Sequence, residues 1–267
     1  MQRMQNSLKA FSQLITLGRF KEAQECLNKH SEDIRHYFPE DHPATYSLIN
    51  NQALLYKLNG QFMEAKIMFQ RVNDSYTKLY GENHPSSINS LINLATVHKD
   101  LQEHDQAIPL YEKALIGRKI TEGENSVAYC MVLAMASGSY REIGKFDVAE
   151  KYIKEAFVTI ASEYGEDSIP AAVVLNSMGM LYKRQQKYER SLDAYDRALA
   201  IREKEMGEGH PDTIAVRHNI AELYITWVKP DKAQEYLQKN IEIMEKKSQQ
   251  EKEILSQGAD LKETNFV

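Results

Sequence analysis

Histidine is the residue type in this sequence with the widest chemical repertoire, because an imidazole exchanges protons near neutral pH and binds metal ions. Of the eight histidines, three stand directly before proline, at His42, His84 and His210. His84 follows His42 by 42 residues, and His210 lies three such intervals further along. Catalytic groups must converge within hydrogen-bond reach, whereas residues at a constant interval mark equivalent positions of a repeat. We therefore predict that these histidines begin helices and neither catalyse a reaction nor bind a metal.

The other sequence motifs add no candidate for catalysis. The chain contains only two cysteines, Cys26 and Cys130, which cannot build a disulfide framework or, by themselves, a tetrahedral zinc site. It has no glycine-rich phosphate loop and no His-Glu-x-x-His, Gly-x-Ser-x-Gly or Cys-x-x-Cys sequence. The sequence thus predicts that the chain is not an enzyme and that it has no catalytic residue, metal or cofactor.

The composition is typical of a folded protein that acts outside the bilayer. The chain has 267 residues, 42% hydrophobic and 27% charged, with a net charge of -5. No stretch approaches the ~18 consecutive apolar residues of a membrane span. Nucleic-acid binders usually carry a basic surplus, which this chain lacks. We therefore expect other proteins as partners, with no nucleic acid and no membrane insertion.

Two observations bear on the cellular compartment. The low cysteine content favours a reducing, intracellular environment, and we expect the cytoplasm. Residues 1–21 contain basic residues and no acidic one, which is typical of a mitochondrial presequence. However, Gly18, Arg19 and Phe20 fall in the register of the repeat described below. We interpret the segment as folded and keep the mitochondrion as the alternative.

A 42-residue repeat runs through the chain without insertion or deletion. One column of the repeat has a small residue, at Ala53, Ala95, Ser137, Gly179 and Ala221. Three residues later each repeat has a ring, at Tyr56, His98, Tyr140, Tyr182 and Tyr224. A third column is again small, at Ala65, Ala107, Ala149, Ser191 and Ala233. Small residues at fixed positions are expected where two helices cross closely, because a larger side chain would separate them.

Each repeat is therefore expected to form two amphipathic helices. The first helix begins at His-Pro or at the equivalent Ser126 or Ser168, because proline suits the first helical turn and serine is a good N-cap. The second helix follows a short turn and ends before a Gly-Glu pair. The glycine there is expected to take the left-handed cap conformation, at Gly81, Gly123, Gly165 and Gly207.

The pattern extends to the N-terminus, where Phe11 and Leu14 are expected in the core. The sequence thus predicts an all-α solenoid of about six antiparallel helix pairs, forming a single domain over residues 1–255. The expected pairs span about residues 1–38, 39–80, 81–122, 123–164, 165–206 and 207–250. We expect the last helix to extend to Leu255 and to end at Gly258, with residues 256–267 as a tail.

The segments GEGHPDTIAVRHNIAELY (207–224) and YDRALAIREKEMGEGHPDT (195–213) resemble the tetratricopeptide repeat in its 42-residue, kinesin light chain form. The resemblance covers nearly the whole chain. It implies a right-handed superhelix whose concave groove is lined by the first helices, and it implies protein binding. We do not expect a motor subunit, because the sequence shows no long heptad-repeat segment and a shared fold does not establish a shared function.

Within this resemblance, one column of the groove carries asparagine, at Asn51, Asn93 and Asn219. In the family, asparagine at this position often hydrogen-bonds the backbone of a bound peptide, since its amide both donates and accepts. Alternatively, asparagine is only the usual residue at a solvated position. The family's clamp for a C-terminal carboxylate also needs lysine or arginine at the first two groove positions. This chain has none there, so we do not expect a chaperone-tail receptor.

Two further sets of residues are expected to line or flank the groove. An apolar strip, which suits an amphipathic helix, consists of Met131, Met135, Val173 and Met180 with Leu54 and Leu58. The alternative is that the face is rotated by one position, so that these residues belong to the core. A flanking basic column, which would pair with acidic ligand residues or simply stay solvated near helix ends, consists of Lys57, Lys99, Arg141 and Lys183.

Two functional hypotheses remain. The first is a non-catalytic scaffold or adaptor whose concave groove holds a peptide or helix from a partner protein. The alternative is a structural subunit or assembly factor of a large complex, mitochondrial in one version, that uses its convex and terminal surfaces. Trp227, the only tryptophan, is expected to cover the end of the core or to anchor a partner.

Overall fold

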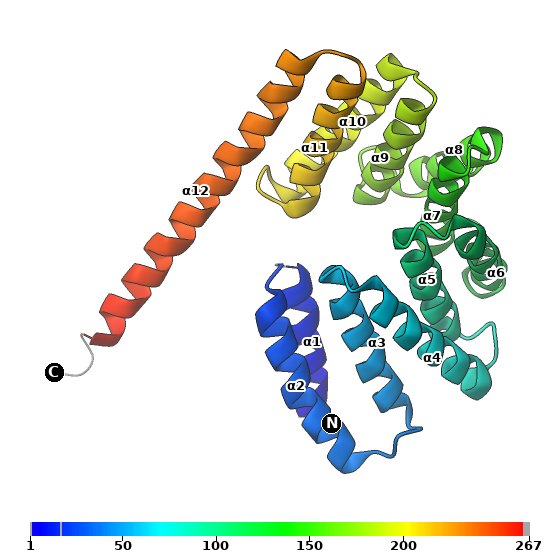
Figure 1. The fold of residues 1–267 in the computed structure, drawn as a ribbon, viewed down its shortest axis with the longest axis vertical. Coiled ribbons are helices and arrows are strands. Elements are labelled where there is room, and N and C mark those ends of the chain that lie inside the picture. The colour runs from blue at the N-terminus through cyan, green and yellow to red at the C-terminus, as the bar shows by residue number, and fades with distance from the viewer. Residues whose placement is uncertain (1, 17, 264–267) are drawn as a thin grey trace. The chain divides into compact units, whose positions relative to one another are not determined.

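The computed structural model describes the backbone of residues 2–16 and 18–263 and the side chains of residues 9–16 and 18–249. All regular secondary structure in these residues is helical, as the sequence predicts (Figure 1). The helices are α1 Gln2–Thr16, α2 Phe20–Tyr37, α3 Pro43–Leu58, α4 Phe62–Tyr80, α5 Pro85–Asp100, α6 His104–Glu122, α7 Val127–Glu142, α8 Phe146–Tyr164, α9 Ile169–Arg184, α10 Tyr188–Met206, α11 Pro211–Thr226 and α12 Pro230–Glu263.

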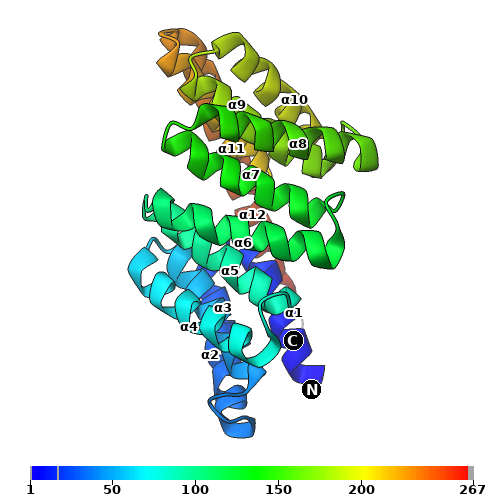
Figure 2. The same ribbon diagram turned by 90° about the vertical axis from the view of Figure 1, so that its right-hand side faces the viewer.

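The chain divides into two compact units, Met1–Gly144 with α1 to α7 and Lys145–Val267 with α8 to α12. In the first unit, each helix from α3 to α6 packs against the next one in sequence, so that helix pairs lie side by side (Figure 2). In the second unit, α9 packs with α10, and α11 packs with both α10 and α12. Each unit is therefore an array in which a helix contacts mainly its neighbours in sequence.

The histidine–proline pairs begin helices, as predicted. The Nδ1 atom of His42 accepts a hydrogen bond from the backbone N–H of Ala44 at 3.1 Å. His84 and His210 make the same contact two residues ahead, each at 3.2 Å. Proline occupies the first helical turn after each of the three, where its missing N–H has no intrahelical partner to lose. These imidazoles are N-caps, a structural role.

The glycine column that ends the second helices differs from the prediction in one dihedral angle. Gly81, Gly123, Gly165 and Gly207 have φ of 83° to 90°, as expected, but ψ of 151° to 166°. The prediction of a left-handed cap was therefore wrong, because a residue in the left-handed helical region has ψ near +47°. The observed region is essentially restricted to glycine, and it sends the chain away from the helix in an extended direction.

The turn between the two helices of a repeat needs a positive φ at one position. This position holds Gly60 and Gly144, with φ of 78° and 76°. In three other repeats a residue with a side chain adopts the same conformation, at Gln102, Gln186 and Val228. Val228, with φ of 57°, is the most unfavourable of these, because a β-branched side chain crowds the left-handed region.

The predicted small columns lie at the centre of the core. Ala53, Ala95 and Ala221 have no exposed surface, and the same holds for Ala65, Ala107 and Ala149. At the N-terminal end Phe11 is buried and Leu14 packs on the same cluster, which confirms that the first pair is part of the fold. Trp227 packs on the core of the second unit, as the end-cover interpretation predicts.

The last helix is longer than expected. α12 continues through Gly258 to Glu263, so the expected end at Gly258 does not occur. A glycine in a helix interior costs about 1 kcal/mol relative to alanine, which weakens a helix without forcing it to stop. Within the described part of the chain, no helix combines the length and the hydrophobicity needed to cross a membrane.

Candidate functional site

The predicted binding residues lie on the first helices of the repeats, which are α3, α5 and α7 in the first unit and α9 and α11 in the second. Within each unit, we call the side of these helices that carries them the first-helix face. All of the predicted groove residues keep some exposure to solvent. Met135 and Leu58 are the most open, each 38% exposed. The others are half-buried, at Asn51, Leu54, Asn93, Met131, Val173, Met180 and Asn219.

Two of the apolar residues also belong to the core. Leu54 packs on two hydrophobic clusters of the first unit, and Met180 packs on a cluster of the second unit. The alternative of a rotated face therefore accounts for part of the strip. Met135 and Leu58 have no such role in the described clusters, and they are the aliphatic groups that the face presents to solvent.

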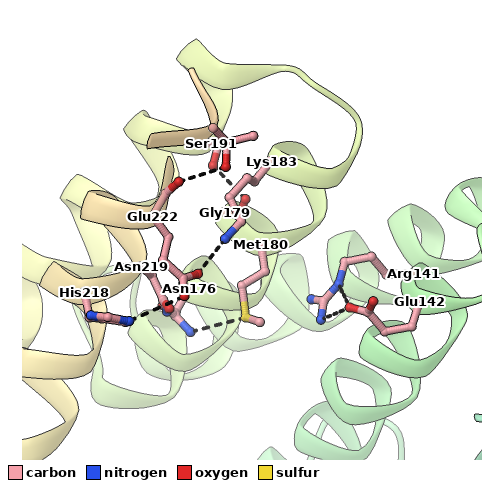
Figure 3. A network of polar contacts seen from close by, with 11 residues as sticks. Arg141, Glu142, Asn176, Gly179, Met180, Lys183, Ser191, His218, Asn219 and Glu222 are labelled. Atoms are coloured by element: carbon pink, nitrogen blue, oxygen red, sulfur yellow. Dashed lines mark hydrogen bonds and ion pairs between the residues drawn. The ribbon is translucent and has the colours of Figure 1, made fainter. Parts of the chain in front are cut away.

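The asparagine column pairs with a second asparagine column that sequence reasoning missed. Asn93 on α5 donates its Nδ2–H to Oδ1 of Asn50 on α3 at 2.9 Å. Asn219 on α11 donates in the same way to Asn176 on α9, also at 2.9 Å (Figure 3). Each bond joins the first helices of two successive repeats. It uses one of the two amide N–H groups and leaves the carbonyl oxygen of Asn93 and Asn219 unengaged among the described residues.

The basic column of the first unit gathers around two carboxylates. Lys57 Nζ lies 3.5 Å from Asp100 Oδ2, and Lys99 Nζ lies 3.8 Å from Asp100 Oδ1. Arg141 contacts Glu142 Oε1 with Nη2 at 2.8 Å. The three cations therefore face two carboxylates, which leaves one positive charge in excess.

The electrostatics of Lys99 reflect this excess. Burial lowers the pKa of Lys99, Asp100 raises it, and the cations of Lys57 and Arg141 lower it further. A lowered lysine pKa means that the surroundings disfavour the ammonium form. An anion placed beside Lys99 would relieve that cost.

In the second unit the basic column ends in an ion pair between repeats. Lys183 Nζ donates to Glu222 Oε2 at 2.8 Å, and His218 Nε2 lies 3.4 Å from Glu222 Oε1 (Figure 3). The hydrogen bond from Lys183 lowers the pKa of Glu222. The acidic partners Asp100 and Glu222 were missed by the sequence analysis because they lie on the next repeat, at positions that carry no repeating residue type.

One further histidine, in the ring column, takes part in a charged group at a turn between helices. His98, in the ring column, lies with Nδ1 2.6 Å from Glu103 Oε2, and Lys66 donates to both oxygens of the same carboxylate. This group ties the turn before α6 to α4. No set of three metal-binding side chains comes together in the part of the chain that the structure describes.

Antiparallel helix pairs that repeat one set of core columns define a helical repeat protein. The tetratricopeptide repeat profile matches residues 45–119, 91–158, 133–204 and 170–246. The chain belongs to the tetratricopeptide repeat family. This confirms the family predicted from the two quoted segments.

Solved structures of similar fold include a Podosopora anserina putative kinesin light chain with nearly identical repeats, with 20% identity, a TM-score of 0.58, and coverage of 77% of this chain and 98% of that one. BtubC (BKLC) from P. vanneervenii has 20% identity and a TM-score of 0.59 over 92% of this chain and 91% of its own. NprR in complex with its cognate peptide NprX has 19% identity and a TM-score of 0.69, and the match covers 90% of this chain and 66% of NprR. NprR is a quorum sensor of B. thuringiensis. No curated protein matches the chain by sequence.

Proposed function

We propose that the chain is a non-catalytic scaffold that binds a peptide or an amphipathic helix of a partner protein on the first-helix face of one unit. The main support for this proposal is the hydrogen bonding of the asparagine column. Asn93 and Asn219 are fixed by a bond to the preceding repeat, yet each keeps an N–H donor and a carbonyl acceptor. A rigid amide that can both donate and accept matches the alternating groups of a peptide backbone.

The other groups of the face indicate what side chains such a ligand would carry. Met135 occupies the position that is asparagine in α3, α5 and α11, and it is exposed. Methionine is flexible and adapts to apolar ligand residues. The excess positive charge around Lys99 favours an acidic residue. We therefore expect a ligand with an apolar residue opposite Met135 and a carboxylate opposite Lys99.

The likeness to NprR with its bound peptide supports a peptide ligand, because it is a protein of the same fold. The identity is 19%, so the comparison supports the fold and the general mode of use only. The residues that would perform this function here are those of the first-helix face described above.

The test is a selection of peptides from a random library against the purified chain, followed by affinity measurements with the enriched peptides. Met135→Asp is expected to raise the Kd about tenfold, which corresponds to about 1.4 kcal/mol. The matched control is Met63→Asp, which makes the same change at a 53% exposed methionine on α4. The control should bind as the wild type does. Absence of any enriched peptide, or equal loss in both variants, would contradict the proposal.

A structural subunit or assembly factor is the second candidate function. Exposed aliphatic side chains on the second helices favour it, namely Met63 and Ile67 on α4 and Ile116 and Ile120 on α6. Under this alternative, Ile67→Asp would abolish association with a complex that Met135→Asp leaves intact. Co-purification of the two variants from the native source separates the candidates.

A further inference from the structure

A cavity of about 180 Å³ lies in the first unit between α4, the loop that follows it, α5 and α6. Its lining is mainly polar and includes Asn73, Glu82, Asn83, Ser87 and Lys113, with Leu91 as an apolar wall. None of these residues belongs to the first-helix face. A ligand of this cavity is therefore independent of the proposed peptide site.

The cavity lies where other repeats have a large apolar side chain. Asn73 is equivalent to residues of three later repeats, namely Leu115, Phe157 and Leu199. In the second unit Phe157 packs on the core cluster, and the guanidinium carbon of Arg197 lies 5.3 Å from the centre of its ring. Lys113 is the equivalent of Arg197. An asparagine side chain is shorter than that of phenylalanine, so the first unit has an opening at the position of this ring.

Two opposite charges on the cavity lining are not paired, although their equivalents in other repeats are. At two other boundaries a cation of the second helix contacts the glutamate of the Gly-Glu sequence before it. These pairs are Arg197 with Glu166 at 2.7 Å and Lys239 with Glu208 at 3.4 Å. The equivalents in the first unit are Lys113 and Glu82. Among the described residues, neither of these two side chains has an ion-pair partner.

The cavity also offers hydrogen-bonding groups. Ser87 is 2% exposed, and its Oγ has no hydrogen-bond partner among the described residues. Asn73 Oδ1 accepts from Ser90 Oγ at 3.3 Å, and the amide N–H groups of Asn73 donate to no described residue. A buried polar group without a partner is unfavourable. A ligand that bonds to these groups therefore gains affinity.

We propose that this cavity binds a free α-amino acid with an aromatic or branched aliphatic side chain. The carboxylate of the ligand faces Lys113, its ammonium group faces Glu82, and its side chain fills the place of the missing ring against Leu91. Pockets for drug-sized ligands measure about 300–1,000 Å³, whereas a cavity of about 150 Å³ holds benzene, so the volume suits one amino acid. A residue within a peptide chain lacks both backbone charges, so the two unpaired charges select the free zwitterion.

The test is calorimetric titration of the full chain with L-phenylalanine and L-leucine up to millimolar concentration. The control ligand is N-acetyl-L-phenylalanine amide, which has the same side chain as phenylalanine and neither charge. We expect one binding site per chain for each amino acid, and an affinity at least about tenfold lower for the blocked compound. Chemical shift changes in ¹H–¹⁵N spectra should be confined to the cavity, including the side-chain amides of Asn73 and Asn83.

Two variants test the assignment of the residues. Asn73→Phe should abolish binding because it fills the cavity as Phe157 does in the second unit, and an unchanged or raised melting temperature would show that the fold is retained. Lys113→Met should raise the Kd by about tenfold, because the carboxylate loses its cation. The matched control is Lys78→Met, at an exposed lysine of α4 outside the cavity lining, which should bind as the wild type does.

Three results would overturn the proposal. The first is the absence of binding heat with both amino acids, and the second is wild-type affinity in Asn73→Phe. The third is equal affinity for the blocked compound, which would assign the cavity to a residue of a partner protein. Peptides selected on the first-helix face should bind Asn73→Phe as they bind the wild type. Failure of one site is therefore distinguishable from failure of the other.

Discussion

Arg217 and Glu203 form an ion pair in which the guanidinium is almost completely enclosed. Arg217 Nη2 donates to Glu203 Oε1 at 2.6 Å, and the arginine side chain is 2% exposed. Its Nη1 donates to the carbonyl oxygen of Glu208 at 2.9 Å. The arginine of α11 thereby ties together the end of α10 and the loop before α11. It occupies a column that holds leucine in other repeats, at Leu91, Leu133 and Leu175.

We predict that Arg217→Ala lowers the free energy of unfolding by about 3 kcal/mol, because it leaves the groups around the guanidinium without their buried partner. Arg217→Leu should cost less, since leucine fills the same column in other repeats. Urea denaturation followed by circular dichroism measures both. An alanine variant as stable as the wild type would show that the ion pair adds nothing.

Gly179→Leu is expected to destabilise the second unit by about 2 kcal/mol or more through overpacking. A Cβ atom at Gly179 would lie 2.5 Å from Cε1 of the Tyr195 ring. The matched control is Gly138→Ala, at a helical glycine where an added Cβ meets nothing within 4 Å. The control should gain up to about 1 kcal/mol from helix propensity. A lower melting temperature for Gly179→Leu and a higher one for Gly138→Ala would agree with Gly179 lying at a close helix crossing. A Gly179→Leu variant with the melting temperature of the wild type would refute this.

Val228→Gly should stabilise the protein by about 0.5–1 kcal/mol, because it relieves a β-branched residue at a φ of 57°. The side chain is 84% exposed, so its removal sacrifices little burial. The reciprocal change, Gly144→Val, should destabilise the first unit for the same reason. The melting temperatures of both variants are compared with that of the wild type. A Val228→Gly variant that melts below the wild type would be inconsistent with strain at this turn.

Stability at high pH should depend on Tyr111. Burial raises the pKa of this phenol from 10.0 to about 12, so the folded state favours the protonated form. The contribution is complete below about pH 10 and is lost as the pH rises towards 12, by about 2–3 kcal/mol for two pKa units. Tyr111→Phe should unfold with a weaker dependence on pH in that range. Identical pH profiles for the two proteins would exclude this linkage.

Much of the fold could be predicted from the sequence because its determinants are local and recur. A glycine at 179 and a serine at 191 reveal a close crossing of helices, and in the structure Ser191 Oγ donates to the Gly179 carbonyl oxygen at 2.7 Å. The histidine–proline starts have the same character, since the capping bond lies within two residues.

The candidate site was harder to predict because its partners come from adjacent repeats. The bond from Asn93 to Asn50 spans 43 residues and that from Lys183 to Glu222 spans 39, so neither follows the 42-residue period. Periodicity shows which residues are equivalent, but not which side chains meet across the boundary between repeats. The buried Arg217 was missed for a related reason, since a charged residue in a leucine column is stabilised only by groups that folding brings to it.

The position of α1 at one end of the first unit has a consequence for how that unit unfolds. A helix at the end of a repeat array is held on one side only, and α1 packs mainly on α2, with Phe11 buried and Gln13 exposed. Unfolding of the first unit should therefore begin at its N-terminal end, with faster amide hydrogen exchange in α1 than in α4 and α5, which have neighbours on both sides.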